Sequence, residues 1–344
     1  MDVSDDISSY VHGAYYPSWR VYKGETPSSM RLDLLNHLTL EQHLDKKADL
    51  DISVDGTKGC LSALRLAKAT THERLQLMLS VGGGSGSAHF PALASTSTGR
   101  EQFATSCRSW VDQYGFDGID LDWEHPSSLE QGRDFLALVQ ALRNSLPVPR
   151  YKLSAALPAG EWCLRNVPLA RVGSVLDNLN LMCYDFVGPW TGVSGYHSQL
   201  YSSTTPQNPY DARSAHTAIS FAITQGIPAN KIVMGIPAYG RSFADVDSPG
   251  KPSKASGGGD GTVLYRDLPL PDMKEQVQRD RVAAYCTGQE GGFVSYDVPE
   301  TVVIKCEYVK AQGLGGVFYW TGVGDATGER SLVAHSHRAL FSKK

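Results

Sequence analysis

Long uninterrupted hydrophobic runs are missing from this chain of 344 residues, and no stretch could span a bilayer as a helix. An excess of one charge is missing too, because 32 basic and 36 acidic side chains leave a net charge of -4. We therefore expect neither nucleic acid nor a membrane as a partner. The first six residues lack the basic start and apolar run of a secretory signal, so we expect a cytoplasmic protein, unless another route carries it to the cell wall or outside.

Cysteine is sparse, and its six occurrences have neither paired metal-ligand spacing nor a compact disulfide pattern. We interpret them mainly as buried thiols: Cys60, Cys107, Cys163, Cys183, Cys286 and Cys306. The ten histidines show no His-Glu-x-x-His or other zinc spacing. We expect no metal and no organic cofactor.

Apolar strand-like runs alternate with amphipathic helical segments along the chain, which is typical of a parallel α/β fold. Hydrophobic residues make up 41% of the sequence, enough for one large domain over residues 1–344. The expected strands cover residues 11–16, 75–81, 116–123, 151–157, 176–184, 231–237 and 315–320. The expected helices cover residues 58–69, 100–113, 129–144, 212–225 and 300–312. Seven strands are convincing, whereas a (β/α)8 TIM barrel needs eight.

Residues 117–124, with the sequence Asp-Gly-Ile-Asp-Leu-Asp-Trp-Glu, carry the strongest functional signal. Side chains alternate along a strand, so Asp120, Asp122 and Glu124 share one face and the apolar residues between them share the other. Three acids on one face of a buried strand repel one another, which raises the proton affinity of at least one and suits it to general acid catalysis. A solvated acidic edge is the alternative, and the intervening apolar residues argue against it.

The octet resembles the signature of glycoside hydrolase family 18, the chitinase family, and four further segments match in the same order. They are Ser80-Val81-Gly82-Gly83, Met182-Cys183-Tyr184-Asp185, Gly235-Ile236-Pro237-Ala238-Tyr239-Gly240-Arg241 and Gly316-Val317-Phe318-Tyr319-Trp320. The resemblance runs from about Tyr15 to Trp320. The glycine run after Val81 lacks the Gly-Lys-Ser/Thr ending of a phosphate-binding loop, so a nucleotide site is not indicated.

The resemblance implies a retaining hydrolase in which the substrate's own 2-acetamido oxygen attacks the anomeric carbon. Glu124 matches the family's acid, which then serves as base, and Asp122 would accept the acetamido N–H. Asp120 would share a proton or hydrogen bond with Asp122, and Tyr184 would hold the acetamide oxygen. Asp117 lies on the opposite parity and is expected to be structural.

The remaining site residues also follow from the resemblance. Trp320 would form the stacking floor of the reacting sugar, with Met182 under the acetamide methyl. The other expected sugar-binding residues are Asp185, Tyr239, Arg241, Trp190 and Tyr15. Gly82 and Gly83 are expected to be structural.

The resemblance predicts a monomeric chitinase that binds chitin or N-acetylglucosamine oligomers and cleaves their β-1,4 bonds. An endo-β-N-acetylglucosaminidase acting on N-glycan cores and a chitin-binding protein with little turnover remain alternatives. Two small departures from the family bear on binding. Gly84 stands where a tryptophan is common, and His125 follows the acid in place of tyrosine.

The second strand is the main departure from the family pattern. After His37, residues 38–54 lack the nearly continuous apolar character of a strand covered on both faces. Either a poor strand closes the barrel or leaves it open with an unpaired edge, or the chain comes from a gene model or transcript that skipped this strand. We favour the second explanation. Both explanations predict a protein less stable than an intact relative. Both also keep a chitin-binding protein with little turnover among the alternatives.

Residues 242–293 interrupt the strand–helix alternation before the last strand. In the larger subclass of the family, a small α+β domain lies here, between the seventh and eighth strands, and walls one side of the cleft. A surface loop without a binding role is the alternative, and the sequence leaves both open.

Overall fold

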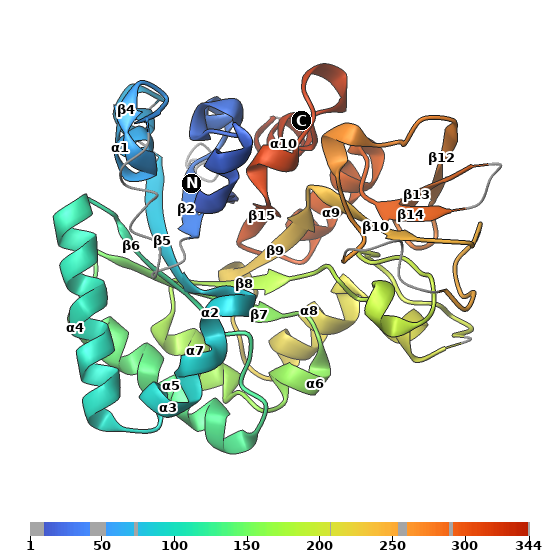
Figure 1. The fold of residues 1–344 in the computed structure, drawn as a ribbon. Helices are drawn as coiled ribbons and strands as arrows, with labels where there is room; N and C mark the ends of the chain where they lie inside the picture. Colours follow the sequence, from blue (N-terminus) through green and yellow to red (C-terminus); the bar gives the residue numbers. More distant parts are fainter. Residues whose placement is uncertain are drawn as a thin grey trace, which may run out of the picture.

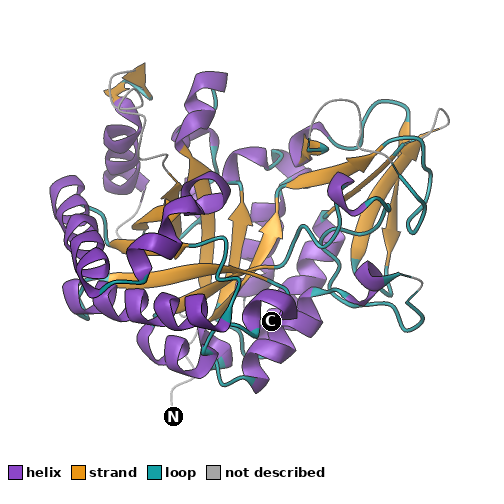
Figure 2. Ribbon diagram, turned by 60° about the horizontal axis from the view of Figure 1, so that its bottom comes forward, coloured by secondary structure: helices purple, strands orange, loops and turns teal. Residues whose placement is uncertain are grey.

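The computed structural model describes residues 10–41, 53–71, 75–206, 208–253, 260–288 and 292–342. Eight parallel strands form a closed barrel in the order β1-β15-β9-β8-β7-β6-β5-β2, with helices packed around its outside (Figures 1 and 2). The predicted (β/α)8 TIM barrel is therefore confirmed. The barrel strands are β1 (Val11–Pro17), β2 (His37–Glu41), β5 (Gln76–Gly82), β6 (Gly118–Asp122), β7 (Lys152–Pro158), β8 (Asn178–Met182), β9 (Ile232–Pro237) and β15 (Gly316–Trp320).

Several of the outer helices begin where the sequence supplies a capping side chain. Thr96, Ser128 and Ser214 each accept a hydrogen bond from a first-turn backbone N–H. The longer helices are α1 (Gly59–Thr71), α4 (Ser97–Tyr114), α5 (Leu129–Ser145), α7 (Leu169–Val175), α8 (Ala215–Thr224), α9 (Pro299–Ala311) and α10 (Leu332–Phe341). The short ones are α2 (Gly83–Gly86), α3 (Phe90–Ala94) and α6 (Glu161–Leu164). All five predicted helices are present, with their ends moved by up to three residues.

Two hydrophobic cores hold the barrel. The larger one lies between strands and helices and receives outward-facing residues such as Ile119 and Leu121 of β6, both fully buried. A smaller cluster lies inside the barrel and centres on Tyr15, Val233 and Phe318. Burial on both faces explains why most strands are almost continuously apolar.

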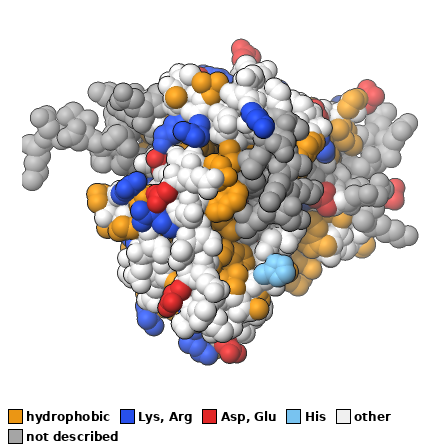
Figure 3. Space-filling model, turned by 60° about the vertical axis from the view of Figure 1, so that its left-hand side comes forward, with side chains coloured by type: hydrophobic (Ala, Val, Ile, Leu, Met, Phe, Trp, Pro, Cys, Tyr) orange, Lys and Arg blue, Asp and Glu red, His pale blue; other side chains and the backbone are white. Residues whose placement is uncertain are grey.

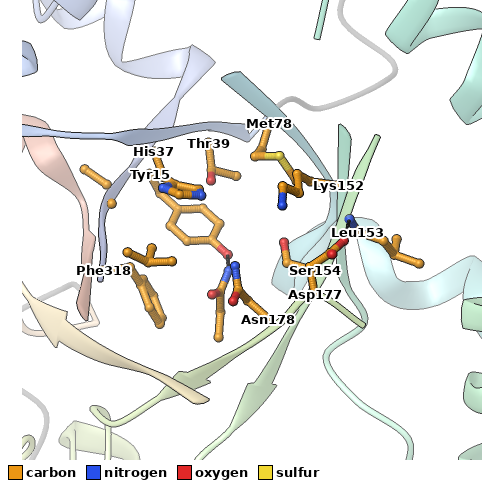
Figure 4. A pocket seen from close by; sticks show the side chains of 14 residues that line it. Tyr15, His37, Thr39, Met78, Lys152, Leu153, Ser154, Asp177, Asn178 and Phe318 are labelled. Atoms are coloured by element: carbon orange, nitrogen blue, oxygen red, sulfur yellow. Dashed lines mark hydrogen bonds between the residues drawn. The ribbon is translucent and has the colours of Figure 1, made fainter. Parts of the chain in front are cut away.

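The lower part of the barrel interior is nearly filled (Figure 4). The cavity drawn there, lined by Thr39, Ser154 and Lys152 among others, has a volume of about 20 Å³. That is room for about one water molecule. Since a sugar cannot fit, a substrate site has to lie elsewhere along the barrel.

The second strand, β2, is present and closes the barrel. The expectation of an open barrel and the expectation of a chain that lacks this strand are therefore both wrong. β2 pairs with β1 over His37–Glu41 and with β5 over the same residues. Leu38 and Leu40 are fully buried on the helix side, whereas Thr39 and Glu41 are nearly buried polar residues. The strand is atypical in this alternation, and residues 42–52 of the unusual segment lie outside the described part of the chain.

The insertion before the last barrel strand is a five-stranded antiparallel sheet, in the order β11-β10-β14-β13-β12. Its strands are β10 (Tyr239–Phe243), β11 (Thr262–Leu264), β12 (Met273–Gln278), β13 (Ala283–Gly288) and β14 (Phe293–Tyr296). In Figure 1 it stands beside the barrel, on the side opposite α4. It connects β9 and β15, as predicted for an insertion between the seventh and eighth strands.

All six cysteines are free and buried, which confirms the prediction of buried thiols. On the face drawn in Figure 3, the basic and acidic side chains of the described residues are scattered and form no large patch of one sign. Within the described ranges, no helix has the length and apolar character needed to cross a membrane.

Candidate active site

A cavity of about 410 Å³ lies at the carboxyl ends of the barrel strands. The β-strands of a (β/α)8 barrel all point to this end, so side chains at their last positions converge there. The cavity is lined by Tyr15, Asp122, Glu124, His125, Ala156, Pro158, Trp162, Met182, Tyr184, Asp185, Trp190, Phe318 and Trp320. Eight of these residues, Tyr15 included, are among the predicted catalytic and binding residues. This cavity is therefore the candidate site.

The side chains of strand β6 alternate between the two faces of the barrel wall, as the sequence predicts. Asp120 and Asp122 are buried on the inner face, and Trp123 is buried against Phe90 and Phe135 on the outer side. Glu124 follows the strand and reaches the cavity. The three acids therefore lie at increasing height along one inner face of the barrel.

Asp120 is the deepest acid, and four hydrogen bonds fix it. Its Oδ2 accepts from Tyr15 (2.7 Å) and Ser80 (3.0 Å), and its Oδ1 accepts from Ser154 (2.6 Å) and Asn180 (3.1 Å). Burial raises the pKa of Asp120, and these four bonds act in the opposite direction by stabilising the charged form.

The expected sharing of a proton or hydrogen bond between Asp120 and Asp122 stays a prediction. A carboxylate offers about four acceptor positions, and the four donors occupy them. Within the described ranges, Asp122 Oδ1 is buried and has no hydrogen-bond partner. Burial, together with the charges of Glu124, Asp120 and Glu41, raises the pKa of Asp122 well above its usual range.

Glu124 reaches solvent through the mouth of the cavity, but the cavity walls remove part of its hydration. This partial burial raises the pKa of Glu124, and the negative charge of Asp185 raises it further. A hydrogen bond with the backbone of Gly84 acts in the opposite direction. The backbone N–H of Glu124 donates to Ser87 Oγ at 2.8 Å, which fixes the start of this loop. The carboxyl group can therefore hold a proton to higher pH than a free glutamate.

Asp185 lies across the cavity and is held by the inserted sheet. Arg241 donates to its two oxygens at 2.8 and 2.6 Å, and Tyr239 OH donates at 2.9 Å. His197 Nδ1 lies 3.5 Å away. These interactions outweigh burial and hold the pKa of Asp185 well below its usual range, so it stays ionised. Tyr239 and Arg241 position Asp185 here, and their contact with a sugar stays a prediction.

The predicted floor residues come together around the inner aromatic cluster. The rings of Tyr15 and Trp320 meet edge to face, with centroids 5.6 Å apart, and Tyr184 contacts Phe318 at 6.3 Å. Met182 packs against the same cluster. Burial and surrounding negative charges raise the pKa of Tyr184 well above its usual range, so its hydroxyl remains a donor. An apolar floor with a fixed hydroxyl suits the face of a pyranose ring.

Two exposed tryptophans stand at the mouth of this cavity. Trp190 is 57% exposed and Trp162 is 44% exposed. Arg241 lies over the Trp190 ring at 4.9 Å, and His125 meets the Trp162 ring edge to face at 4.4 Å. His125, which stands where tyrosine is common in the family, therefore makes an aromatic contact with Trp162. Large exposed aromatic rings beside a catalytic carboxyl group are suited to binding the part of a substrate beyond the cleaved bond.

A second cavity of about 640 Å³ extends the site beyond Trp320, which lines both. Its walls include Trp19 from the segment after β1, and Tyr239, Arg241, Thr262, Val263 and Leu264 from the inserted sheet. The insertion thus walls one side of the cleft. The sequence left open whether residues 242–293 wall the cleft or form a surface loop without a binding role. The structure supports the first alternative.

The three residues expected to be structural, Asp117, Gly82 and Gly83, lie at or next to the contact between β5 and β6. Asp117 pairs with Lys68 at 2.5 Å and accepts from the backbone N–H of Leu77 at 2.7 Å. Gly82 and Gly83 have φ angles of 127° and 75°, which favour glycine. A Cβ on Gly82 would lie 1.9 Å from the carbonyl oxygen of Asp122, so only glycine allows β5 and β6 to approach here.

Sequence reasoning missed residues that line the two cavities, among them Trp19 and Trp162, and it missed Glu41 at the end of β2. Trp19 and Trp162 follow β1 and β7 by a few positions, and aromatic residues just after barrel strands are a signal that could have found them. Glu41 ends β2, but the strand itself was not predicted. The signal there was the alternation of leucine with polar residues over 38–41.

Comparisons with known proteins agree with this geometry. The model of the family described as glycosyl hydrolases family 18 matches residues 12–325. Chitinase 1 of Aphanocladium album is 32% identical over 98% of this chain and 86% of its own length. Endochitinase 1 of Metarhizium robertsii is 32% identical over 96% of this chain and 85% of its own length. A chitinase from Cycas revoluta, solved in complex with (GlcNAc)3, superimposes with a TM-score of 0.80 at 24% identity, covering 96% of this chain and 98% of that one.

Proposed function

Because this chain belongs to glycosyl hydrolases family 18, we propose that it is a chitinase that cleaves β-1,4-linked N-acetylglucosamine polymers and oligomers with retention of configuration. The observation that carries the proposal is the placement of Glu124. Its carboxyl group lies in a substrate-sized cavity, with a raised pKa, among Asp122, Tyr184 and Trp320. These are the groups that acid-catalysed cleavage of an acetamido sugar requires.

In the first step, Glu124 donates its proton to the glycosidic oxygen as the bond to the leaving sugar breaks. The acetamido oxygen of the substrate attacks the anomeric carbon and forms a cyclic oxazolinium ion, so no protein nucleophile is needed. Glu124, now ionised, takes a proton from water, which attacks the same carbon. Two inversions at one carbon give overall retention.

The neighbouring residues hold the acetamido group in line for that attack. Among the described residues Oδ1 of Asp122 has no hydrogen-bond partner, so it can accept the acetamido N–H and stabilise the positive charge that develops. Tyr184 keeps its hydroxyl proton and can donate it to the acetamido oxygen. The rings of Tyr15 and Trp320 provide an apolar floor below the reacting sugar.

Turnover is favoured over chitin binding without cleavage. The argument for a binding remnant was the damaged second strand, but β2 closes the barrel with pairing on both sides. The acid, its neighbouring aspartates and the tyrosine are all present in one site. An endo-β-N-acetylglucosaminidase would share these groups, and release of an intact N-glycan without cleavage of chitin oligomers would favour that activity.

The test is hydrolysis of fluorogenic N-acetylglucosamine dimer and trimer by the wild-type protein and by Glu124→Gln. We expect the variant to lose a factor of about 10² to 10⁴ in kcat, the usual contribution of a general acid. Glu101→Gln, an exposed change on α4, is the matched control and should keep wild-type turnover. Undiminished turnover in Glu124→Gln, or none in a folded wild-type protein, would overturn the proposal.

A further inference from the structure

The second cavity of the cleft has two walls that come from distant parts of the sequence. The short helix η2 (Ser18–Lys23), which follows β1, brings Trp19 to the cavity. The insertion brings strand β11, which continues directly into the short helix η10 (Tyr265–Asp267). The width of the cavity therefore depends on how η2 and the insertion are held relative to each other.

Glu25 lies just after η2, lines the second cavity and joins its two walls. The residue is only 9% exposed. One carboxylate oxygen, Oε2, pairs with Arg20 of η2, and the other, Oε1, pairs with Arg266 of η10. Arg266 also donates to the backbone oxygen of Val323, in the segment after β15, at 2.7 Å. A single carboxylate thus connects the segment after β1 to the insertion.

The backbone around Glu25 is fixed to the barrel. Gly24 has a φ angle of 75°, which favours glycine and turns the chain after η2. The backbone N–H of Glu25 donates to the backbone oxygen of Arg20 at 3.2 Å. The hydroxyl of Tyr16, a fully buried residue of β1, donates to the backbone oxygen of Glu25 at 2.8 Å. The carboxylate is therefore anchored to a barrel strand as well as to its two arginines.

The cluster contains two positive charges and one negative charge. The two guanidinium groups bind opposite oxygens of the same carboxylate, so they lie close to each other. The side chains of Arg20 and Glu25 are 14% and 11% exposed, so water screens these charges only in part. Without the charge of Glu25, the two arginines would repel each other across the contact between η2 and the insertion.

The second cavity lies on the side of the reacting sugar that faces away from the leaving group. Trp162 and Trp190 line the catalytic cavity with Glu124 but do not line the second one. Trp320, the expected floor of the reacting sugar, lines both. A chain that passes over Trp320 therefore has its leaving part in the first cavity and the rest in the second. In a fluorogenic oligomer the fluorophore is the leaving group, so the sugars beyond the first one enter the second cavity.

We propose that Glu25 is a positioning residue for substrate binding: its ion pairs with Arg20 and Arg266 hold Trp19 and the inserted sheet at the separation that binds these sugars. The inference rests on the proposed function, in which the reacting sugar lies on Trp320. Glu25 does not need to touch a sugar, because it acts through the position of the two walls.

The KM of the fluorogenic trimer tests the proposal with Glu25→Gln. Glutamine keeps the shape of the side chain but removes the charge that holds both arginines. We expect KM to rise by about 2- to 10-fold, the equivalent of one aromatic contact, with kcat little changed. KM does not depend on the concentration of folded enzyme, so a variant that only folds less well would not show this rise. An unchanged KM in Glu25→Gln would overturn the proposal.

Asp177→Asn is the matched control. It breaks a largely buried ion pair with Arg143 at the opposite end of the barrel and should keep the wild-type KM. Arg266→Gln breaks the same link as Glu25→Gln and should also raise KM. The double variant Glu25→Gln/Arg266→Gln should raise KM no further than the larger single effect. Increases that multiply in the double variant would show independent roles and would contradict the proposal.

Hydrogen exchange gives a readout that does not depend on activity. In Glu25→Gln the backbone amides of η2 and of η10 should both exchange faster, because each helix loses its link to the other. Asp177→Asn should leave both unchanged. Faster exchange in η2 alone, or in neither helix, would contradict a link between the two walls. A folded wild-type protein without turnover would contradict the proposed function, while this measurement would still decide whether Glu25 joins the walls.

Discussion

The guanidinium group of Arg241 holds both carboxylate oxygens of Asp185, with Nε to Oδ1 at 2.8 Å and Nη2 to Oδ2 at 2.6 Å. Arg241 belongs to the inserted sheet and Asp185 follows barrel strand β8. A paired, planar contact of this kind fixes the orientation of the carboxylate and keeps it ionised. The insertion therefore places a permanent negative charge where it raises the proton affinity of Glu124.

Replacing Asp185 with asparagine should move the alkaline limb of the kcat/KM profile to lower pH. This limb reports loss of the proton from Glu124, and removal of the Asp185 charge lowers the pKa of Glu124. Asp260→Asn is the matched control, because Asp260 also pairs with Arg241 but is not among the charges that act on Glu124. A limb that stays in place in Asp185→Asn, or moves upward, would show that Asp185 does not set the proton affinity of the acid.

Trp162→Ala should weaken the binding of longer oligomers. The ring is 44% exposed at the mouth of the catalytic cavity and can stack on a sugar beyond the cleaved bond. Loss of about 0.5 to 1.5 kcal/mol of aromatic contact corresponds to a rise in KM of about 2- to 12-fold for a chitin hexamer. Tyr201→Ala removes an exposed aromatic ring that lines neither cavity of the cleft and should leave KM unchanged. The same KM in Trp162→Ala as in the wild type would exclude a sugar contact there.

Lys305→Met should strongly destabilise the protein. Lys305 on α9 pairs with Asp297 at 2.6 Å, and both side chains are almost completely buried. Removing the cation leaves a buried carboxylate without its counter-charge, which costs about 3 to 5 kcal/mol. Chemical denaturation would measure this loss. The double variant Asp297→Asn/Lys305→Met has no unpaired charge and should recover part of it, whereas equal losses in both variants would argue against the electrostatic explanation.

Seven barrel strands and five helices could be predicted because their residues repeat in a simple way. A strand packed between helices and an apolar interior is apolar almost throughout, and Ile232–Pro237 is buried at every position. β2 breaks that pattern for a physical reason. Its inner face meets polar surroundings, with Thr39 at the small polar cavity and Glu41 beside the catalytic acids, so only its outer face is apolar. A rule based on continuous apolar runs therefore misses it.

The candidate site was predictable where one strand carries several functional residues. Asp120, Asp122 and Glu124 share a face because of β-strand alternation, which the sequence alone displays. Contacts between segments distant in sequence cannot be predicted from such a local pattern. These contacts depend on how the closed barrel brings separate strands together. Examples are the ring contact of His125 with Trp162, the ion pair of Arg241 with Asp185 and the four hydrogen-bond donors around Asp120.

The stereochemistry of cleavage tests the central claim most directly. Proton NMR of a chitin hexamer, recorded during the first minutes of hydrolysis, distinguishes the anomers of the newly formed reducing ends before they interconvert. Attack by the substrate's own acetamido group, followed by water, predicts that the β-anomer forms first and that Glu124→Gln forms almost none. Initial formation of the α-anomer, or absence of cleavage by the folded wild-type protein, would contradict the account.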